Sequence, residues 1–229
     1  MESVDILAFG SHPDDVEFGC GAILIKMAKQ GKSVAMADFT LGDKGTNGDP
    51  ETRRNESLAA AAVVGAKRYF LDFKDCEIVD NYENRLKVVE LIRKVRPKLV
   101  LVPMWTGTMN HPDHLICGQI VRYACRFARF AKILPELPIH WIQGVLHYIP
   151  PTGMAPDFIF DISDEVEAWK EMMGCHASQM RTFGFIDWRI KEAAHMGVLI
   201  DKPYAQGLVK GNPVVVKDIM DIAQGTREL

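Results

Sequence analysis

Short apolar runs alternate with longer amphipathic stretches along the first half of the chain. Apolar runs of this length, bounded by turn-forming residues, favour buried strands, whereas apolar positions at helical spacing predict helices. Glycines at the ends of several stretches suit helix C-termini. The first half therefore predicts strands at 4–9, 34–40, 68–73 and 99–102, and helices at 17–30, 51–64, 82–95 and 112–130.

The second half is less regular. It predicts strands at 140–149 and 157–162, a helix at 164–175 and a weaker helix at 190–199. Strand and helix alternate at the spacing of βαβ units, which favours an α/β fold whose mostly parallel sheet has helices on both faces. No repeat, low-complexity segment or linker divides the sequence, so residues 1–229 are expected to form a single domain.

Composition narrows the class of protein. The 229 residues are 48% hydrophobic and 25% charged, with a formal net charge of -3 and the two signs interleaved. A nucleic-acid surface would need a basic stripe, so we expect no nucleic-acid partner. The cysteines stand singly at positions 20, 76, 117, 125 and 175, a usage typical of reduced proteins. With no basic leader and no long apolar stretch, the chain is expected to be cytoplasmic and without a membrane partner.

Two polar segments follow predicted strands and carry the candidate chemistry. Residues 11–17 read Ser-His-Pro-Asp-Asp-Val-Glu after the first strand, and residues 111–114 read His-Pro-Asp-His after the fourth. Ligands of parallel α/β sheets bind beyond the carboxyl ends of the strands. Both segments are therefore expected to face one crevice.

These segments supply a metal-ligand set. A catalytic zinc needs about three protein ligands and an open position for water, and His12, Asp15 and His114 provide nitrogen and oxygen donors of the right kind. Zinc lowers the pKa of a bound water toward ~7, which makes hydroxide available at neutral pH. Two histidines and one carboxylate also describe an iron(II) site, so Fe²⁺ is a second possible metal.

The neighbouring residues offer proton transfer. Asp14 can act as general base, and His111 can donate to an oxyanion while Asp113 holds its imidazole protonated. Simpler interpretations exist, because a single His-x-x-Asp is common and Pro112 with Asp113 also suits an ordinary helix start. Two such segments at the ends of parallel strands favour the metal site.

The two segments resemble the PIG-L/LmbE family of zinc deacetylases, whose fold is Rossmann-like. The resemblance rests on residues 8–17 (AFGSHPDDVE), 111–114 (HPDH), 53–60 (RRNESLAA) and 204–207 (YAQG). It is nearest to the bacillithiol-biosynthesis branch, which deacetylates N-acetylglucosaminyl-malate. That branch forms trimers or hexamers, so the resemblance implies a small-molecule amino-sugar substrate and a homo-oligomer.

The resemblance also implies roles for individual residues. It assigns zinc to His12, Asp15 and His114, the general base to Asp14, and the oxyanion donor to His111, oriented by Asp113. It further implies that Arg53 contacts the substrate and that Asp75 meets sugar hydroxyls, although residues 73–76 depart from the family's usual run. The family's late Tyr-Ala-Glu-Gly-Phe is also altered, because Gln206 replaces its carboxylate.

Several alternatives stay open. The substrate could be another N-acetylated amino sugar, such as a chitobiose or an antibiotic glycoside, although Lys44, Arg53 and Arg54 would suit an anionic group such as malate. A nucleotide-binding Rossmann domain is a further interpretation, but the turn after the first strand lacks the Gly-x-Gly-x-x-Gly spacing. A non-catalytic metal-binding module is the third.

Three weaker site candidates complete the sequence-based predictions. Cys20 could replace Asp15 as a ligand, and His147 could reach the site from the second half. The glycine-rich residues 42–48 could form a loop that covers the site, or could simply turn the chain.

Overall fold

The computed structural model describes residues 3–106, 111–148, 154–216, 218 and 220. Within these residues, seven strands form a sheet in the order β3-β2-β1-β4-β5-β7-β6. The strands are β1 (Ile6–Gly10), β2 (Val34–Asp38), β3 (Lys67–Phe70), β4 (Leu99–Pro103), β5 (Gly144–Tyr148), β6 (Phe158–Asp161) and β7 (Ala205–Lys210). Strands β1 to β5 pair in parallel, and β7 runs antiparallel to both β5 and β6. The prediction of a mostly parallel sheet is confirmed.

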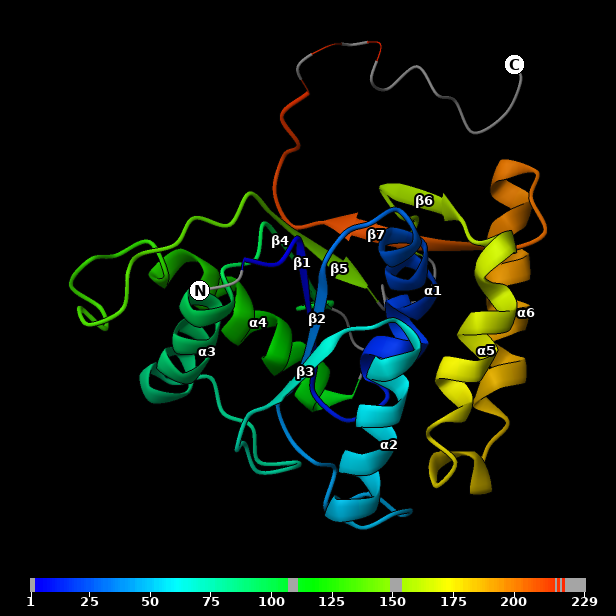
Figure 1. Cartoon of the computed structure of the whole chain (residues 1–229), viewed down its shortest axis with the longest axis horizontal. Helices are drawn as coiled ribbons and strands as arrows, with labels where there is room; N and C mark the ends of the chain where they lie inside the picture. Colours follow the sequence, from blue (N-terminus) through cyan, green and yellow to red (C-terminus); the bar gives the residue numbers. More distant parts are fainter. Residues whose placement is uncertain (1–2, 107–110, 149–153, 217, 219, 221–229) are drawn as a thin grey trace.

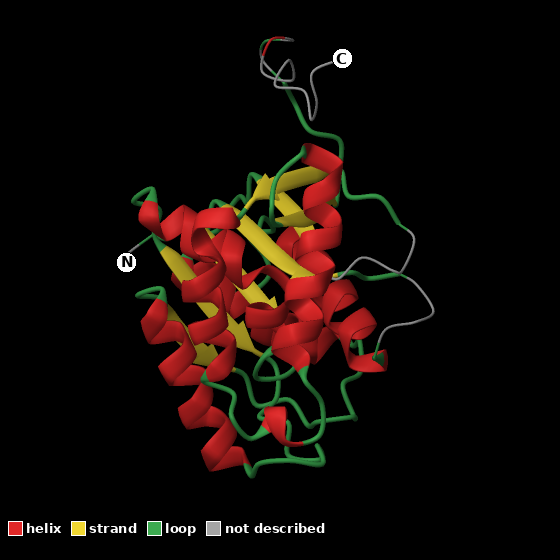
Figure 2. Cartoon of the chain, turned by 90° about the vertical axis from the view of Figure 1, so that its right-hand side faces the viewer, coloured by secondary structure: helices red, strands yellow, loops and turns green. Residues whose placement is uncertain are grey.

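Helices cover both faces of this sheet, as expected (Figure 1). They are α1 (Asp15–Lys29), α2 (Pro50–Val63), α3 (Tyr82–Val95), α4 (Pro112–Phe127), α5 (Val166–Gly174) and α6 (Phe185–Gly197). Side chains of a strand alternate between the two faces, so Leu7 and Phe9 of β1 pack with α3 and α4, whereas Ile6 and Ala8 pack with α1 and α5. The sheet thus separates two apolar cores, and Figure 2 shows helices in front of its strands.

The second half differs most from the sequence-based prediction. Strand β7 was not predicted, α6 begins at Phe185 rather than at 190, and β5 is shorter than the predicted 140–149, of which Ile149 lies outside the described residues. None of the described helices has both the length and the apolarity to cross a membrane.

Helix α1 is kinked, and the second half of the chain fills the kink. Cys20 has non-helical angles (φ -147°, ψ 15°), which opens the ladder of backbone hydrogen bonds. The indole Nε1 of Trp169 donates to the Glu17 carbonyl at 2.7 Å, and the side-chain oxygen of Gln206 accepts the Ile23 amide at 3.1 Å. Both freed backbone groups are therefore satisfied in the interior.

The chain leaves β1 and β4 toward opposite faces of the sheet. β1 leads into α1 on one face, and its neighbour β4 leads into α4 on the other. A crevice between two such neighbouring strands is where open α/β sheets bind ligands. The two histidine-bearing segments follow these two neighbouring strands along the chain.

Candidate metal centre

Asp15 anchors the loop that follows β1. One carboxylate oxygen accepts the backbone N–H groups of Ser11 and His12, at 2.8 and 3.0 Å. The other oxygen lies 2.9 Å from Nε2 of His114, on the second loop. Burial would raise the pKa of Asp15, but the imidazoles of His114 and His12 outweigh it and hold that pKa well below its usual value. Asp15 is thus ionised and joins the two loops.

Gly10 makes the tight start of this loop possible. A Cβ atom at Gly10 would lie 3.0 Å from the Cβ of Asp15 and 3.1 Å from the His12 carbonyl oxygen. Cβ contacts this short are uncommon, so the loop would have to shift by a few tenths of an ångström to admit a larger residue. The glycine ending β1 therefore sets how near Asp15 lies to the strand.

His12 lies among carboxylates. Its Nδ1 is 3.6 Å from Asp15, and its Nε2 is 3.1 Å from both Asp75 and Asp113. Burial alone would lower the pKa of His12, but hydrogen bonds to these three carboxylates raise it to about 12. The same excess of negative charge would stabilise a divalent cation next to the imidazole.

The donor set matches a zinc site. One ligand atom each from His12, Asp15 and His114 can be chosen so that all three lie within 4.8 Å of one another. Two imidazole nitrogens and one carboxylate oxygen are a common protein contribution to catalytic zinc. The metal-ligand residues that the sequence indicated are therefore brought together, and their chemistry fits the ion.

His111 lies at the N-cap of α4 and is more exposed than the ligand candidates. Its ring centre is 4.9 Å from that of His12 and 5.5 Å from that of His114. Burial, followed by the charges of these two neighbours, lowers the pKa of His111. We therefore expect a neutral imidazole at neutral pH.

Asp113 contacts His111 through its backbone rather than its carboxylate. The Asp113 N–H donates to Nδ1 of His111 at 3.2 Å. The carboxylate instead accepts the Cys76 N–H at 2.9 Å and lies against Nε2 of His12. Asp113 thus orients His12 with its side chain and His111 with its main chain, an arrangement that sequence spacing does not reveal.

Asp14 lies between the ligand candidates His12 and Asp15, and its carboxyl group is partly buried. Burial raises its pKa to about 6, and the charge of Asp15 acts in the same direction, whereas Arg53 opposes them. The Arg53 guanidinium lies 3.2 Å from the Asp14 carboxylate. A carboxyl group with a raised pKa next to a metal-ligand set is suited to general base chemistry.

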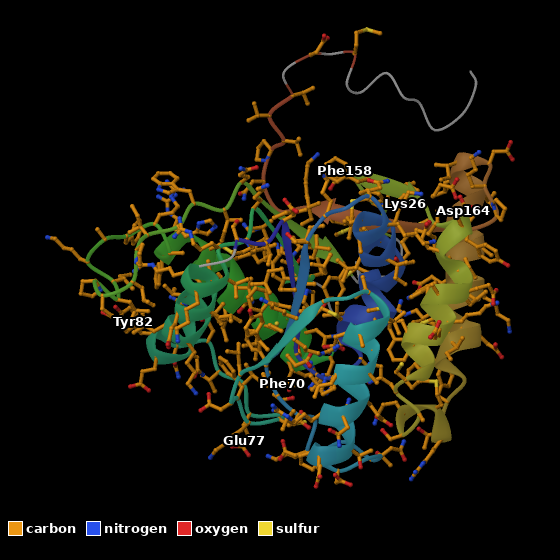
Figure 3. All side chains as sticks on the ribbon, viewed as in Figure 1. Lys26, Phe70, Glu77, Tyr82, Phe158 and Asp164 are labelled. Carbon is orange, nitrogen blue, oxygen red and sulfur yellow. The ribbon has the colours of Figure 1, made fainter. Side chains whose placement is uncertain are left out.

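The residues expected to meet substrate are largely engaged within the protein. Arg53 is 4% exposed, Asp75 is 2% exposed, and Asp75 accepts the Lys44 N–H at 2.8 Å. The Lys44 ammonium pairs with Glu77, which Figure 3 labels at the lower end of the molecule, and the Arg54 guanidinium lies 4.3 Å from the Phe70 ring centre.

A buried network of ion pairs surrounds Glu17, which lies in the first turn of α1 directly after the first loop. Glu17 pairs with Arg68, and Arg68 also bonds Asp38 at 2.7 Å through two nitrogens. His176 Nε2 lies 3.0 Å from Glu17. Burial would raise the pKa of Glu17, but the two cations lower it to about 2. These four residues come from separate parts of the chain, and no local sequence pattern predicts that they meet.

The weaker candidates lie away from the ligand set. Cys20 lies inside the α1 kink, and burial raises the pKa of its thiol, which disfavours a thiolate ligand. His147 bonds the Pro103 carbonyl at 3.1 Å, and neither Cys20 nor His147 belongs to a potential metal cluster among the described residues. Gln206 fills the kink of α1.

Known proteins and a family model match most of this chain. A family model described as PIG-L, GlcNAc-PI de-N-acetylase, matches residues 7–125, which include both histidine loops. Diacetylchitobiose deacetylase of Thermococcus kodakarensis is 31% identical, over 89% of this chain and 81% of that protein. A deacetylase of 1D-myo-inositol 2-acetamido-2-deoxy-alpha-D-glucopyranoside from Corynebacterium glutamicum is 24% identical, over 79% and 76%. The crystal structure of a conserved protein from Thermus thermophilus, TT1542, has a TM-score of 0.86 at 29% identity, over 93% and 97%.

Proposed function

This chain belongs to the PIG-L/LmbE family of de-N-acetylases, and from that premise we propose that it hydrolyses the acetamide of an N-acetylglucosamine-type substrate. The observation that carries the proposal is the convergence of His12, Asp15 and His114, whose candidate ligand atoms lie within 4.8 Å of one another. Zinc, with iron(II) as the alternative, would polarise the amide carbonyl and lower the pKa of a water molecule at this position.

The remaining steps fall to the protein's own residues. Asp14 accepts a proton from the attacking water and returns it to the amine nitrogen as the C–N bond breaks. The products are acetate and the free amino sugar. The raised pKa of Asp14, about 6, suits both proton transfers, because this carboxyl group can hold and release a proton near neutral pH.

His111 donates a hydrogen bond to the oxyanion that forms on the carbonyl carbon. Because its Nδ1 accepts the Asp113 N–H, the neutral ring carries its proton on Nε2, which is then available to donate. A donor placed where negative charge develops stabilises the transition state more than the ground state. Asp75 and Asp113 keep His12 in one orientation.

The group attached to the amino sugar is the finer part of the proposal. The family resemblance favours N-acetylglucosaminyl-malate, whereas the relative from Thermococcus kodakarensis is a diacetylchitobiose deacetylase. The three cations that would suit malate are engaged by Asp14, by Phe70 and by Glu77. The buried pairing of Arg53 with Asp14 and the similarity to the diacetylchitobiose deacetylase support a neutral second group, so we propose diacetylchitobiose as the better substrate and N-acetylglucosaminyl-malate as the alternative.

Acetate release from a panel tests this proposal. Purified protein reconstituted with zinc or iron(II) is assayed on diacetylchitobiose, N-acetylglucosaminyl-malate and free N-acetylglucosamine. We expect turnover of at least one of them, with the highest kcat/KM on the disaccharide and loss of activity after chelation. A faster reaction with N-acetylglucosaminyl-malate would show that malate is the preferred attached group. It would still support the proposed hydrolysis of the amide.

Asp14→Asn tests the mechanism. General base catalysis contributes about 100- to 10,000-fold, so kcat should fall by that factor. The metal content should stay at the wild-type level, because Asp14 is not among the proposed ligands. A variant that binds zinc normally and still turns over at the wild-type rate would rule out Asp14 as the base.

A further inference from the structure

Asp14 has a backbone conformation that is unfavourable for its residue type. Its φ angle is 109° with ψ at -29°, whereas residues with a side chain rarely adopt positive φ. Its side chain makes no capping hydrogen bond to α1. Such strain persists only where the surrounding structure holds it in place, and it gathers at functional sites.

The surrounding group that holds this strained residue is Arg53. One guanidinium nitrogen, Nη2, donates to the Pro13 carbonyl at 2.7 Å and to the Asp14 carboxylate at 3.2 Å. The other terminal nitrogen, Nη1, donates to the Gly42 carbonyl at 3.1 Å. The planar guanidinium thus holds both the peptide group between Pro13 and Asp14 and the carboxylate of Asp14 itself.

The glycine-rich loop between β2 and α2 makes room for this arginine. It lies at the end of the molecule where β1 passes into α1 (Figure 1). A Cβ atom at Gly42 would lie 1.6 Å from the Arg53 Nη1 atom, and one at Gly48 would lie 3.0 Å from its Cγ atom. Both glycines also have positive φ. Their small size, as well as their backbone freedom, is therefore required here.

We propose that Arg53 is a positioning residue and that residues 42–48 are its socket: together they hold the strained Asp14 so that its carboxylate is oriented for proton transfer. The inference rests on the proposed function of Asp14 as general base. It differs from the expectation that Arg53 contacts the substrate. A substrate contact would act mainly on KM, whereas a positioning residue acts on kcat.

Arg53→Ala and Gly42→Ala test the two halves of this assembly. Misplacing a catalytic group by about 1 Å costs roughly 100-fold, so each variant should lose about that factor in kcat while KM changes less than about twofold. Zinc content should match the wild type.

Gly65→Ala is the matched control for the glycine. Its φ is also positive, at +66°, but a Cβ atom there meets nothing within 4 Å. The control therefore carries the same backbone penalty without touching Arg53, and its kcat should stay at the wild-type value. If Gly42→Ala folds, binds zinc and keeps wild-type kcat, the socket is wrong.

Added guanidinium gives a readout that a merely structural role would not move. At concentrations that leave the protein folded, it should restore part of the kcat of Arg53→Ala but leave wild type and Gly65→Ala unchanged. Arg53→Lys should remain impaired, because an ammonium lacks the planar fork that bridges three acceptors. An Arg53→Ala variant with raised KM and unchanged kcat would overturn the proposal, whereas an active Asp14→Asn would overturn the proposed base instead.

Discussion

The two histidine-bearing loops are held in different ways. The loop after β1 closes on itself, because Asp15 accepts the amides of Ser11 and His12. The segment that begins α4 reaches outward instead: the Asp113 carboxylate lies against His12, and its carbonyl accepts the Ser11 hydroxyl at 3.1 Å. His12 is 9% exposed, whereas His111 is largely open to solvent.

This difference bears on two tasks that one site must combine, although the second segment also supplies a proposed ligand, His114. A metal ligand has to be fixed before the ion arrives, which suits a loop that is braced by its own backbone. A donor to a developing oxyanion must remain reachable by substrate, which suits the more open segment. Damage to the first loop should therefore remove the metal, whereas damage at His111 should leave it bound.

Asp15→Ala should have the largest effect. It removes a proposed ligand, the acceptor of two loop amides and the partner of His114 at once. We expect zinc content near zero and no measurable deacetylation, by metal analysis and acetate release. Stoichiometric zinc in a folded variant would show that Asp15 is not required to bind the metal.

His111→Gln should damage catalysis and leave metal binding intact. Loss of one oxyanion donor costs about 100- to 1,000-fold in kcat. Zinc content and KM should remain near the wild-type values, measured on the same preparation. If the variant loses zinc, His111 also supports metal binding and the two tasks are not separate.

Gly10→Ala should give an intermediate effect on the metal. The new Cβ atom would press on Asp15 and on the His12 carbonyl, which displaces the loop without removing a ligand. Disturbed support of ligands typically costs 10- to 100-fold, so we expect zinc affinity to fall by about tenfold in a competition assay with a chelator. Gly174→Ala is the control, because a Cβ atom there meets nothing within 4 Å.

Substitution of His147 should have the smallest effect. It concerns how the free energy of unfolding depends on pH. Burial is the main cause that lowers its pKa from 6.5 to about 4. Between those values the unfolded chain binds a proton that the folded chain does not, so stability falls as pH drops from about 6.5 toward 4.

The pH effect can be isolated with His147→Gln, which removes this titration. The stability difference between pH 7 and pH 5 in urea unfolding should then shrink, by at most about 2 kcal/mol. His147 bonds Pro103, the last residue of β4, so the effect also reports on how the second loop is supported. An unchanged pH difference would mean that His147 is not buried in its neutral form.

Elements with a clear apolar pattern could be predicted from the sequence. The predicted helix 82–95 coincides with α3, because Asn81 caps its start and Arg96 ends it in a left-handed conformation before a proline. Strand β7 was missed, since residues 205–210 are short, contain a glycine and pair antiparallel, so they lack the continuous apolar run of a buried parallel strand.

The candidate site, too, could be predicted from the sequence only in part. The motif residues could be brought to one edge of the sheet from topology alone, because parallel strands place their carboxyl ends together. Side-chain partners could not be predicted in that way. Whether Asp113 faces His12 or His111, and whether Arg53 faces substrate or Asp14, depends on χ angles and on loops far apart in sequence.

The plugged kink of α1 bears on how this protein can be divided. The family model ends at residue 125, yet Trp169 and Gln206 complete hydrogen bonds of a helix inside that span. A fragment truncated after α4 would expose the Glu17 carbonyl and the Ile23 amide within an apolar surface. Hybrids between family members would therefore have to exchange α1 together with α5 and β7.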